Sequence, residues 1–345
     1  MHFNMNLRVV YFLSALLPTV AFGATGTFDM ERWNTMLDNV RERAAAQNIS
    51  TTTIDAVMQT PKFIPSIVKS DRNQSEFKLT LAQYLARTVN ANRIADGRRM
   101  RGRYPTLLGR VENAYGIPSH VVLAFWGMET NYGTTHGRHK LKNAFFTLMY
   151  DGRREKFFGD QLLALMKIAD DNKLDVNEIR GSWAGAMGHF QFIPTTLQQY
   201  GTDGNGDGRI DIINNVSDAM FSAGNYLNKL GWNPNERIVR RVILPADFDI
   251  GLLDGKTKKS VLEWSRRGVL SSDGTALPQS EIIAGIVADT SAIDNEQTDY
   301  NPDTDVQPTR TITAYLTYPN FYRIKKWNNS NWYAIAIAEL SDKLK

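Results

Sequence analysis

The chain has 345 residues, 42% hydrophobic and 22% charged, which is enough to bury one large core or two modest ones and too mixed for a disordered protein. Its 40 Lys and Arg against 36 Asp and Glu leave a formal charge of +4, a milder excess than nucleic-acid binders carry. The absence of cysteine excludes disulfides, thiolate metal sites and cysteine nucleophiles.

Residues 1–23 are predicted to be a cleaved export signal. His2 and Arg8 precede an apolar run from Val9 to Phe22, and Ala21-Phe22-Gly23 supplies small residues at a cleavage site. A buried helix or a membrane anchor is the alternative, but the run of about 14 residues is shorter than the roughly 20 that a spanning helix needs. No cysteine follows for lipid attachment, so we expect a soluble protein outside the cytoplasm with no stable membrane anchor.

The chain from residue 24 to 112 is predicted to be helical. Trp33, Met36, Leu37 and Val40 recur at helical spacing, and a second periodic stretch runs from Phe77 through Tyr84 and Leu85. Residues 113–235 are richer in Gly, Trp, Phe and Met, and their pattern is typical of helices joined by glycine turns.

A small β-rich subdomain is predicted over residues 236–318. Strands are expected at Arg237 to Leu244 and Thr309 to Tyr318, with turns at Leu253-Asp254-Gly255 and Ser272-Asp273-Gly274 and a polar surface loop over 289–308. A helix from Trp332 to Leu344 returns the last segment, 319–345, to the helical part. The predicted fold class is therefore mainly α, with a small β-rich insertion near the C-terminus.

The segment from Asp203 to Asp211 fits the first nine positions of an EF-hand loop. Asp203, Asn205 and Asp207 supply side-chain oxygens, Arg209 supplies its carbonyl, and glycine makes the sharp turn. Position 12 is an asparagine instead of the usual glutamate, so either calcium affinity is low or Asp218 closes a longer loop. A turn without metal is the alternative. A single loop of this kind favours a structural calcium ion over a sensor.

Glu129 lies at the end of a strongly apolar helix that Pro118 and Ser119 are expected to open, Ser119 as its cap. Burial raises the pKa of a carboxyl, which is what a general acid needs near neutral pH. The alternatives are a glutamate that emerges at the helix end or one that pairs with Arg153 or Arg154.

A second segment, Gly181 to Pro194, combines glycines and alanines with aromatic and polar side chains. Small residues let a ligand approach the backbone, and Ser182 and Gln191 offer hydrogen bonds to hydroxyls and amides. A tight turn in a helical core is the alternative. His136 and His139 show no zinc-site spacing and are expected in a solvated basic loop.

Taken together, these motifs resemble those of the lytic murein transglycosylases of the membrane-bound B type, whose core is similar to goose-type lysozyme. The resemblance runs from about Phe28 to Leu340. It rests on Phe125 to Thr130, Gly152-Arg153-Arg154, Gly181 to Pro194, the Asp203 loop, Asn225-Tyr226, and Tyr318 to Tyr322 with Trp327-Asn328. It implies a lysozyme-like core, a calcium site closed by Asp218 and no organic cofactor.

The resemblance also implies the activity and the site. The family cleaves the MurNAc-β-1,4-GlcNAc bond of peptidoglycan without water and leaves a 1,6-anhydro end, so Glu129 is expected to be acid and then base. The residues expected to contact substrate are Tyr84, Arg153, Arg154, Ser182, Gln191, Phe192, Tyr226, Trp327 and Asn328. Trp327 stands where the best-known member of the family has a tyrosine, a difference that keeps a stacking face but removes a hydroxyl.

Three alternatives stay open at this point. The chain could be a hydrolytic muramidase, or it could bind peptidoglycan without cleaving it. A helper carboxylate could also assist Glu129, with Glu112, Asp151 and Glu155 as candidates. We expect a monomeric periplasmic protein whose partners are glycan strands and muropeptides, not nucleic acid.

Overall fold

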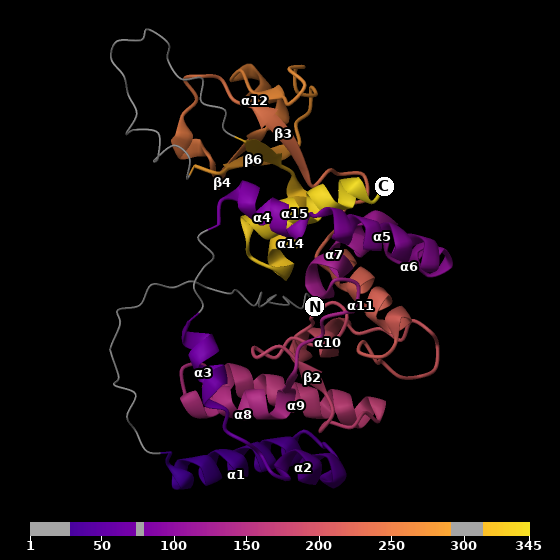
Figure 1. Cartoon of the computed structure of the whole chain (residues 1–345), viewed down its shortest axis with the longest axis vertical. Coiled ribbons are helices and arrows are strands. Elements are labelled where there is room, and N and C mark those ends of the chain that lie inside the picture. Colours follow the sequence, from indigo (N-terminus) through magenta and orange to yellow (C-terminus); the bar gives the residue numbers. More distant parts are fainter. Residues whose placement is uncertain (1–27, 74–78, 291–312) are drawn as a thin grey trace, which may run out of the picture. The chain divides into compact units, whose positions relative to one another are not determined.

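The computed structural model describes residues 28–73, 79–290 and 313–345. They form two compact units, which we call the helical unit (28–73 and 96–226) and the sheet unit (79–95, 227–290 and 313–345). Figure 1 shows their elements in chain colours. The predicted export signal lies outside the described residues.

The described residues of the helical unit form helices and one short strand pair. These elements are α1 (Met30–Ala46), α2 (Thr51–Met58), α3 (Pro65–Arg72), most of α5 (Ala91–Arg103), α6 (Pro105–Tyr115), α7 (Ser119–Thr130), α8 (Leu141–Asp151), α9 (Glu155–Asn172), α10 (Pro194–Tyr200) and most of α11 (Val216–Lys229), with β1 (His139–Lys140) antiparallel to β2 (Arg180–Gly181).

Helices α7 and α8 form much of the core of this unit. Every residue from Val121 to Gly127 of α7 is buried, and so is every residue from Leu141 to Met149 of α8. Helix α8 packs against α3 and α9, and α9 also contacts α1, α2 and α10 (Figure 1). A helix that is covered on all sides needs apolar residues all round, which explains why α7 lacks a polar stripe.

Aromatic rings join α1 to α8. Trp33 lies 6.1 Å from Phe146 and 5.6 Å from Tyr150, measured between ring centroids, and Phe63 lies 5.2 Å from Tyr150. Trp33, with Met36 and Val40, is also on the buried face of α1, as the helical spacing predicts.

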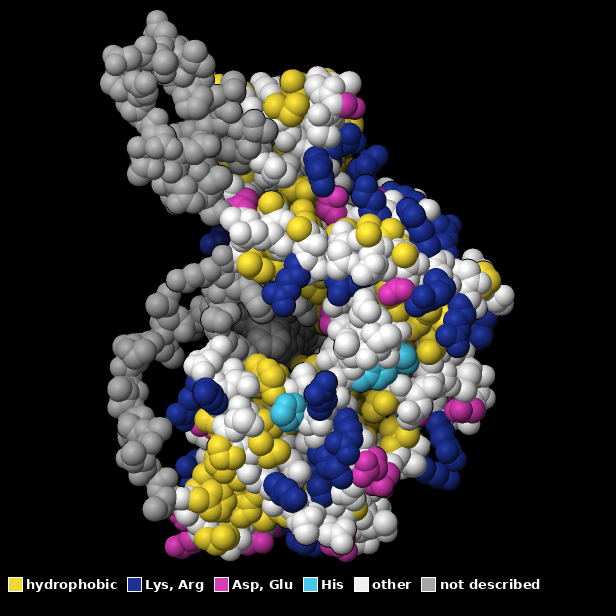
Figure 2. Space-filling model, viewed as in Figure 1, with side chains coloured by type: hydrophobic (Ala, Val, Ile, Leu, Met, Phe, Trp, Pro, Cys, Tyr) yellow, Lys and Arg dark blue, Asp and Glu magenta, His cyan; other side chains and the backbone are white. Residues whose placement is uncertain are grey.

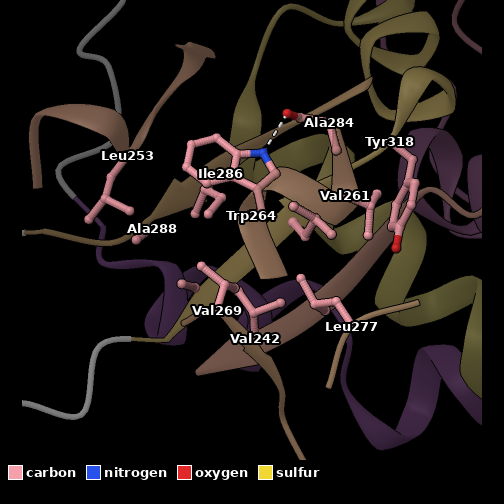
Figure 3. Packing of buried hydrophobic residues seen from close by; sticks show 12 residues of the cluster. Val242, Leu253, Val261, Trp264, Val269, Leu277, Ala284, Ile286, Ala288 and Tyr318 are labelled. Carbon is pink, nitrogen blue, oxygen red and sulfur yellow. Dashed lines mark hydrogen bonds between the residues drawn. The ribbon is translucent and has the colours of Figure 1, made fainter. Parts of the chain in front are cut away.

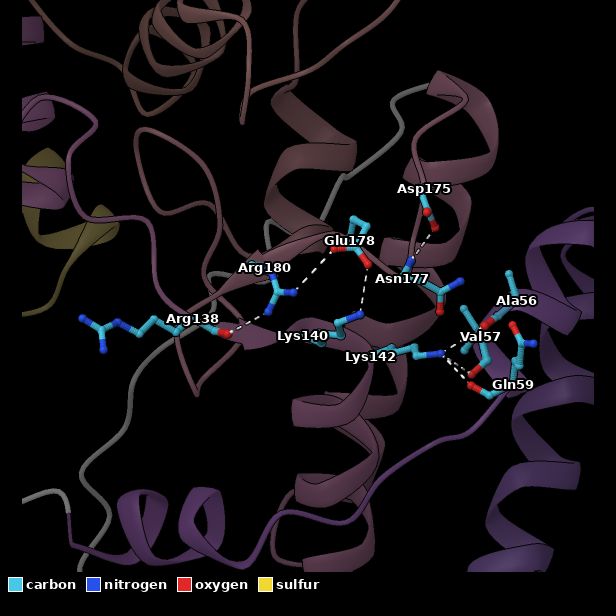
Figure 4. A network of polar contacts seen from close by, with 10 residues as sticks. All are labelled: Ala56, Val57, Gln59, Arg138, Lys140, Lys142, Asp175, Asn177, Glu178 and Arg180. Carbon is cyan, nitrogen blue, oxygen red and sulfur yellow. Dashed lines mark hydrogen bonds and ion pairs between the residues drawn. The ribbon is translucent and has the colours of Figure 1, made fainter.

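A buried lysine joins α8 to the end of α2. Lys142 is 4% exposed, and its ammonium donates to the carbonyls of Ala56, Val57 and Gln59, at 3.1, 3.5 and 2.8 Å (Figure 4). These carbonyls belong to the last turn of α2 and the residue after it, and carbonyls at a helix end have no amide of the same helix to bind. Burial lowers the pKa of Lys142. The nearby Lys140 instead pairs with exposed Glu178.

The sheet unit is built on a five-stranded antiparallel sheet in the order β4-β6-β7-β3-β5. Its elements are α4 (Leu81–Thr88), β3 (Val239–Ile243), the 3-10 turn η1 (Ile250–Leu252), β4 (Asp254–Ser260), α12 (Val261–Arg266), β5 (Leu270–Ser271), β6 (Ile283–Ala288), β7 (Ala314–Thr317), α14 (Pro319–Trp327) and α15 (Asn331–Lys343).

Trp264 of α12 lies in the centre of the core of this unit. It is fully buried, packs with Val242, Val261 and Ile286, and donates from Nε1 to the Ala284 carbonyl at 2.8 Å (Figure 3). The indole nitrogen is therefore satisfied inside an apolar cluster. Helix α15 packs against both α4 and α14, so an early segment and the C-terminal segment of the chain meet in one unit.

The predicted fold class is confirmed, and most elements lie where the sequence indicates. Strands β3 and β7 fall within the two predicted strands, although residues 309–312 lie outside the described part, as does most of the 289–308 loop. The turn predicted at Leu253-Asp254-Gly255 is confirmed in part: Leu253 completes a turn with its amide bonded to the Ile250 carbonyl, but Asp254 already begins β4, whose register shifts near Gly255 at φ 69°. The predicted division of the chain into domains at residues 112, 235 and 318 stays a prediction.

Within the described ranges no helix is both long and apolar enough to span a bilayer.

Replacing Lys142 with Met should lower the free energy of unfolding by about 1 to 3 kcal/mol, since the carbonyls at the end of α2 lose a buried donor. Lys140→Met is the matched control, because it removes an ammonium from a solvent-exposed ion pair. Urea unfolding measured by circular dichroism compares the two variants. Equal losses in both would show that the Lys142 contacts do not stabilise the α2 end.

Candidate active site

Glu129 lies half-buried on the last turn of α7, and the backbone after it turns sharply. Asn131, Tyr132 and Gly133 have φ angles of 48°, 59° and 82°, so two side-chain-bearing residues occupy the left-handed region. Such residues are strained and persist only where their surroundings hold them. The Tyr132 ring folds back over Gly127, where a Cβ would lie 2.7 Å from it. The end of α7 therefore has a specific, packed geometry.

Thr130, the neighbour of Glu129, is fully buried and ties this turn to the rest of the unit. Its Oγ1 donates to the His189 carbonyl at 2.7 Å and accepts from the Gly133 amide at 3.0 Å. The His189 amide donates in turn to the Ile212 carbonyl at 3.1 Å. These bonds connect the Glu129 turn to the Gly181–Pro194 segment and to the loop after Asp203.

The His189 side chain reinforces the same connection. Trp126 Nε1 donates to His189 Nδ1 at 3.1 Å, so Nδ1 is an acceptor and the imidazole is neutral with its proton on Nε2. Burial and the neighbouring His136 lower the pKa of His189 to about 4.

His136 lies in a loop with exposed neighbours, as the sequence indicates, but its own side chain is not fully solvated. It is half-buried, its ring centroid is 4.7 Å from that of His189, and burial lowers its pKa. Its Nε2 atom is buried and has no hydrogen-bond partner within the described part of the chain. The spacing of the histidines gave no signal of this contact, because it depends on the turn after α7.

The Gly181–Pro194 segment folds mainly on itself. Ser182 Oγ accepts from the Ala186 amide at 3.0 Å, and Gln191, at φ 49°, donates from Nε2 to the Gly188 carbonyl at 3.0 Å. A Cβ on Gly185 would lie 2.2 Å from the Phe145 ring. This glycine is therefore required for packing against the protein, while Ser182 and Gln191 both remain half-buried. Substrate binding by these two residues stays a prediction.

Phe192 and Tyr226, both predicted to contact substrate, come together. Their ring centroids are 5.9 Å apart, and Tyr226 stacks on Tyr200 at 4.6 Å. Burial, followed by the adjacent Tyr200, raises the pKa of Tyr226 to about 12. The Tyr226 hydroxyl is therefore neutral at any physiological pH.

Arg153 and Arg154 both bind Asp71, a residue that the sequence analysis missed. Arg154 Nη2 lies 2.7 Å from Asp71 Oδ1, and Arg153 contacts Oδ2 through Nε at 3.1 Å and also through Nη2. The Asp71 side chain is 1% exposed, whereas that of Arg153 is 53% exposed. Two guanidinium groups on one carboxylate leave a net positive charge at this position. Ile67 and Asp71, four residues apart on the buried face of α3, were the available signal.

Of the three candidate helper carboxylates, Glu112 and Asp151 bind other residues and Glu155 is exposed to solvent. Glu112 Oε2 accepts hydrogen bonds from the amide and the hydroxyl of Ser119, at 3.0 and 2.6 Å. Ser119 is the first residue of α7, so the prediction that it caps this helix is wrong. Asp151 pairs with Arg72 at 2.5 Å. Glu155 is exposed in the first turn of α9.

Three predicted substrate contacts belong to the sheet unit. Tyr84 is on α4, Trp327 is the last residue of α14, and Asn328 caps that helix with an extended backbone. Glu129, Arg153, Arg154, Ser182, Gln191, Phe192 and Tyr226 belong to the helical unit.

The Asp203 loop has the backbone that an EF-hand-like loop needs. Gly206 and Gly208 have φ angles of 82° and 81°, and their amides donate to Asp203 at 2.6 and 2.7 Å. The Asn205 side chain accepts a hydrogen bond from the Asp207 amide at 3.1 Å, and the Asp207 side chain accepts one from the Arg209 amide at 2.9 Å. Side-chain oxygens thus shape the loop in the order the motif requires.

Asp218 closes the loop from α11. It is fully buried, and its carboxylate oxygens accept from the Gly204 and Asp211 amides at 3.0 and 2.8 Å. Burial raises its pKa, and the negative charge of Asp203 adds to this effect. A divalent cation would relieve that repulsion, so the donor set fits calcium in its chemistry. Among the described residues, however, no three acidic or imidazole side chains gather closely enough to form a metal site as they stand.

Replacing His189 with Gln should flatten the acid limb of the stability profile. The unfolded imidazole takes up a proton below pH 6.5 whereas the folded one stays neutral to about pH 4, so stability falls as pH drops through that window. The slope is at most about 1.4 kcal/mol per pH unit. Gln can still accept from Trp126 but does not titrate. Urea unfolding between these pH values compares it with wild type and with His139→Gln, and identical slopes would contradict the assignment.

Comparisons with known proteins identify the family. Residues 32–342 match the model of the transglycosylase SLT domain. The chain is 28% identical over 260 residues to the membrane-bound lytic murein transglycosylase B of Escherichia coli K12, an alignment that spans 75% of this chain and 65%, less than two thirds, of that relative.

Solved structures agree with this match. SltB3 from Pseudomonas aeruginosa in complex with NAG-anhNAM-pentapeptide is 34% identical with a TM-score of 0.82, covering 90% of this chain and 79% of that one. The Escherichia coli lytic transglycosylase Slt35 in complex with calcium has the same fold, with a TM-score of 0.75 at 23% identity, covering 91% and 92%. The chain therefore belongs to the transglycosylase SLT domain family.

Proposed function

We propose that this protein is a lytic transglycosylase that cleaves the MurNAc-β-1,4-GlcNAc bond of peptidoglycan and forms 1,6-anhydroMurNAc ends. The observation that carries the proposal is the placement of Glu129, a half-buried residue at the end of a buried helix that is followed by a strained turn and fixed by the Thr130–His189 hydrogen bond. Family membership and the complex of SltB3 with an anhydro sugar support the same chemistry.

In this mechanism Glu129 donates a proton to the bridging oxygen as the glycosidic bond breaks. It then accepts the proton of the C6 hydroxyl of the same MurNAc, whose oxygen attacks C1. A hydroxyl on the reacting sugar has a high effective molarity, so a second carboxylate and a water molecule are not required. A general acid and base of this kind contributes about 10² to 10⁴ in rate. The partners found for Glu112 and Asp151 agree with a single-carboxylate route.

Other residues would bind and orient the glycan. We assign saccharide contacts to Ser182, Gln191, Phe192 and Tyr226 in the helical unit, and the same role to Tyr84, Trp327 and Asn328 in the sheet unit. Arg153 and Arg154 would hold lactyl or peptide carboxylates. Asp71 fixes their direction and leaves the pair with net positive charge, which suits an acidic ligand.

We further propose that the protein is exported to the periplasm, soluble after cleavage at residue 23 and monomeric. Calcium would bind at Asp203, Asn205, Asp207, the Arg209 carbonyl and Asp218, with no organic cofactor. There the ion would link the loop to α11 as a structural clip, because these ligands come from both. The match to a calcium complex of the same fold supports this assignment.

Glu129→Gln should abolish cleavage and leave muropeptide binding intact, because the amide keeps the shape of the side chain but holds no transferable proton. We expect the rate to fall at least about 10²-fold. Glu155→Gln, which changes an exposed glutamate of α9, is the control and should retain full activity. Turbidity loss of purified sacculi gives the rate, and full activity of the Glu129→Gln variant would remove the assignment.

Mass spectrometry of the released muropeptides separates the alternative functions. A hydrolytic muramidase adds one water, about 18 Da, that an anhydro product lacks. A peptidoglycan-binding protein without catalysis would give no soluble product with either the wild type or the variant.

Calcium should raise the melting temperature, since a ligand that binds only the folded state stabilises it by about 2.7 kcal/mol at 100 times its dissociation constant. Asp203→Asn should remove most of that increase. Asp249→Asn is the matched control, because Asp249 makes a similar short turn by accepting the Gly251 amide at 2.9 Å in the sheet unit. Thermal unfolding with calcium or magnesium measures the effect, and an equal increase in both variants would place the ion elsewhere.

A further inference from the structure

Helix α5 carries an exposed face of arginines that the proposed catalytic mechanism does not use. Its 13 residues include five arginines and one acidic residue, Asp96. Gly97 and Met100 are the buried positions, and Arg98, Arg99, Arg101 and Arg103 are all exposed. We call these four residues the arginine face. Figure 2 shows several Lys and Arg side chains over the part of the helical unit where Figure 1 places α5 and α6.

The arginine face brings like charges close together on one helix. Arg98 and Arg101 are three residues apart and Arg99 and Arg103 four apart, so like charges lie side by side on the helix surface, which is destabilising. Arg99 pairs with Asp96 at 2.9 Å, and Arg103 lies over the Tyr104 ring at 5.3 Å. By composition the helix carries five arginines and one acidic residue, and the four side chains of the arginine face are exposed. A binding role explains that excess, whereas core packing does not.

The chemistry of the arginine face favours an acidic polymer over a membrane. A helix that lies on a lipid surface also exposes large apolar or aromatic side chains. The large hydrophobic residues that are exposed in the described part of the chain are Phe28, Met30, Ile243, Ile250, Ile282 and Ile283, and none of them is on α5 or α6. We therefore expect contact through this face to be mainly electrostatic.

We propose that the arginine face binds the carboxylates of peptide stems on peptidoglycan and keeps the protein on its insoluble substrate between cleavage events. The proposal rests on the proposed function. A glycan that carries a peptide on every second sugar presents many carboxylates, so several weak, exposed contacts act together while each can exchange. None of the four arginines is among the residues assigned to saccharide contact.

The experiment is co-sedimentation with purified sacculi, using the Glu129→Gln background so that the substrate stays intact. Changing Arg98, Arg99, Arg101 and Arg103 together to Gln should weaken binding about tenfold at low ionic strength, as expected for four exposed charge contacts. The difference should vanish near 1 M salt, where the Debye length is about 3 Å. The fourfold Lys variant should retain most of the binding, because the interaction depends on charge.

A second fourfold variant controls for net charge alone. Arg41, Lys229 and Lys256 are exposed on three separate elements and Lys345 is exposed after the end of α15, and their change to Gln should leave sacculus binding within about twofold of wild type. Equal losses in both fourfold variants would reduce the effect to net charge and overturn the proposal. Tighter binding to vesicles of anionic phospholipid than to sacculi would overturn the choice of partner.

Activity assays with Glu129 present separate this proposal from the proposed function. The fourfold Gln variant should cleave short soluble glycan fragments at the wild-type rate and act more slowly on sacculi. If the wild type cleaves neither substrate, the proposed function fails whatever the binding result. If both proteins cleave sacculi equally fast, the arginine face has no such role.

Discussion

The candidate active site depends on how the end of α7 is held. A carboxyl next to a buried helix turn has many orientations unless the chain after it is fixed, and here Asn131, Tyr132 and Gly133 adopt left-handed backbone angles in succession. That conformation persists because buried Thr130 bonds the His189 carbonyl and because the Tyr132 ring packs on Gly127. Strain in the turn is thus offset by packing and hydrogen bonds around Glu129.

Two buried charged residues of the helical unit, Lys142 and Asp71, also have hydrogen-bond or ion-pair partners. Lys142 satisfies three carbonyls at the end of α2, and Asp71 holds two arginines, so each connects segments that are distant in sequence. A buried charge without such partners would cost several kcal/mol, so these contacts fix the relative position of the segments they join. For Arg153 and Arg154 the same contact orients guanidinium groups that still have donors to offer an acidic ligand.

The Asp203 loop extends this arrangement. Its amides are already bonded to Asp203 and Asp218, and Ile212 accepts the His189 amide, so the loop touches the segment that supports the Glu129 turn. A cation bound there would rigidify a region that is hydrogen-bonded through His189 to the turn after Glu129. Positive charge at Arg153 and Arg154 and on α5 would suit the acidic glycan proposed as substrate, although the net charge of the chain is only +4.

The sequence alone determined the mainly helical class, the small β-rich part, strands β3 and β7, the glutamate after an apolar helix and the EF-hand-like turn, because periodicity and turn chemistry are local. It did not reveal Asp71 as the partner of two arginines, the His136–His189 contact, or the engagement of Glu112 by Ser119. Each of these joins residues brought together only by folding, and a local pattern carries no information on such pairs. Tertiary structure likewise decided that Gly185 serves packing against Phe145, since a glycine in sequence does not show which atoms approach it.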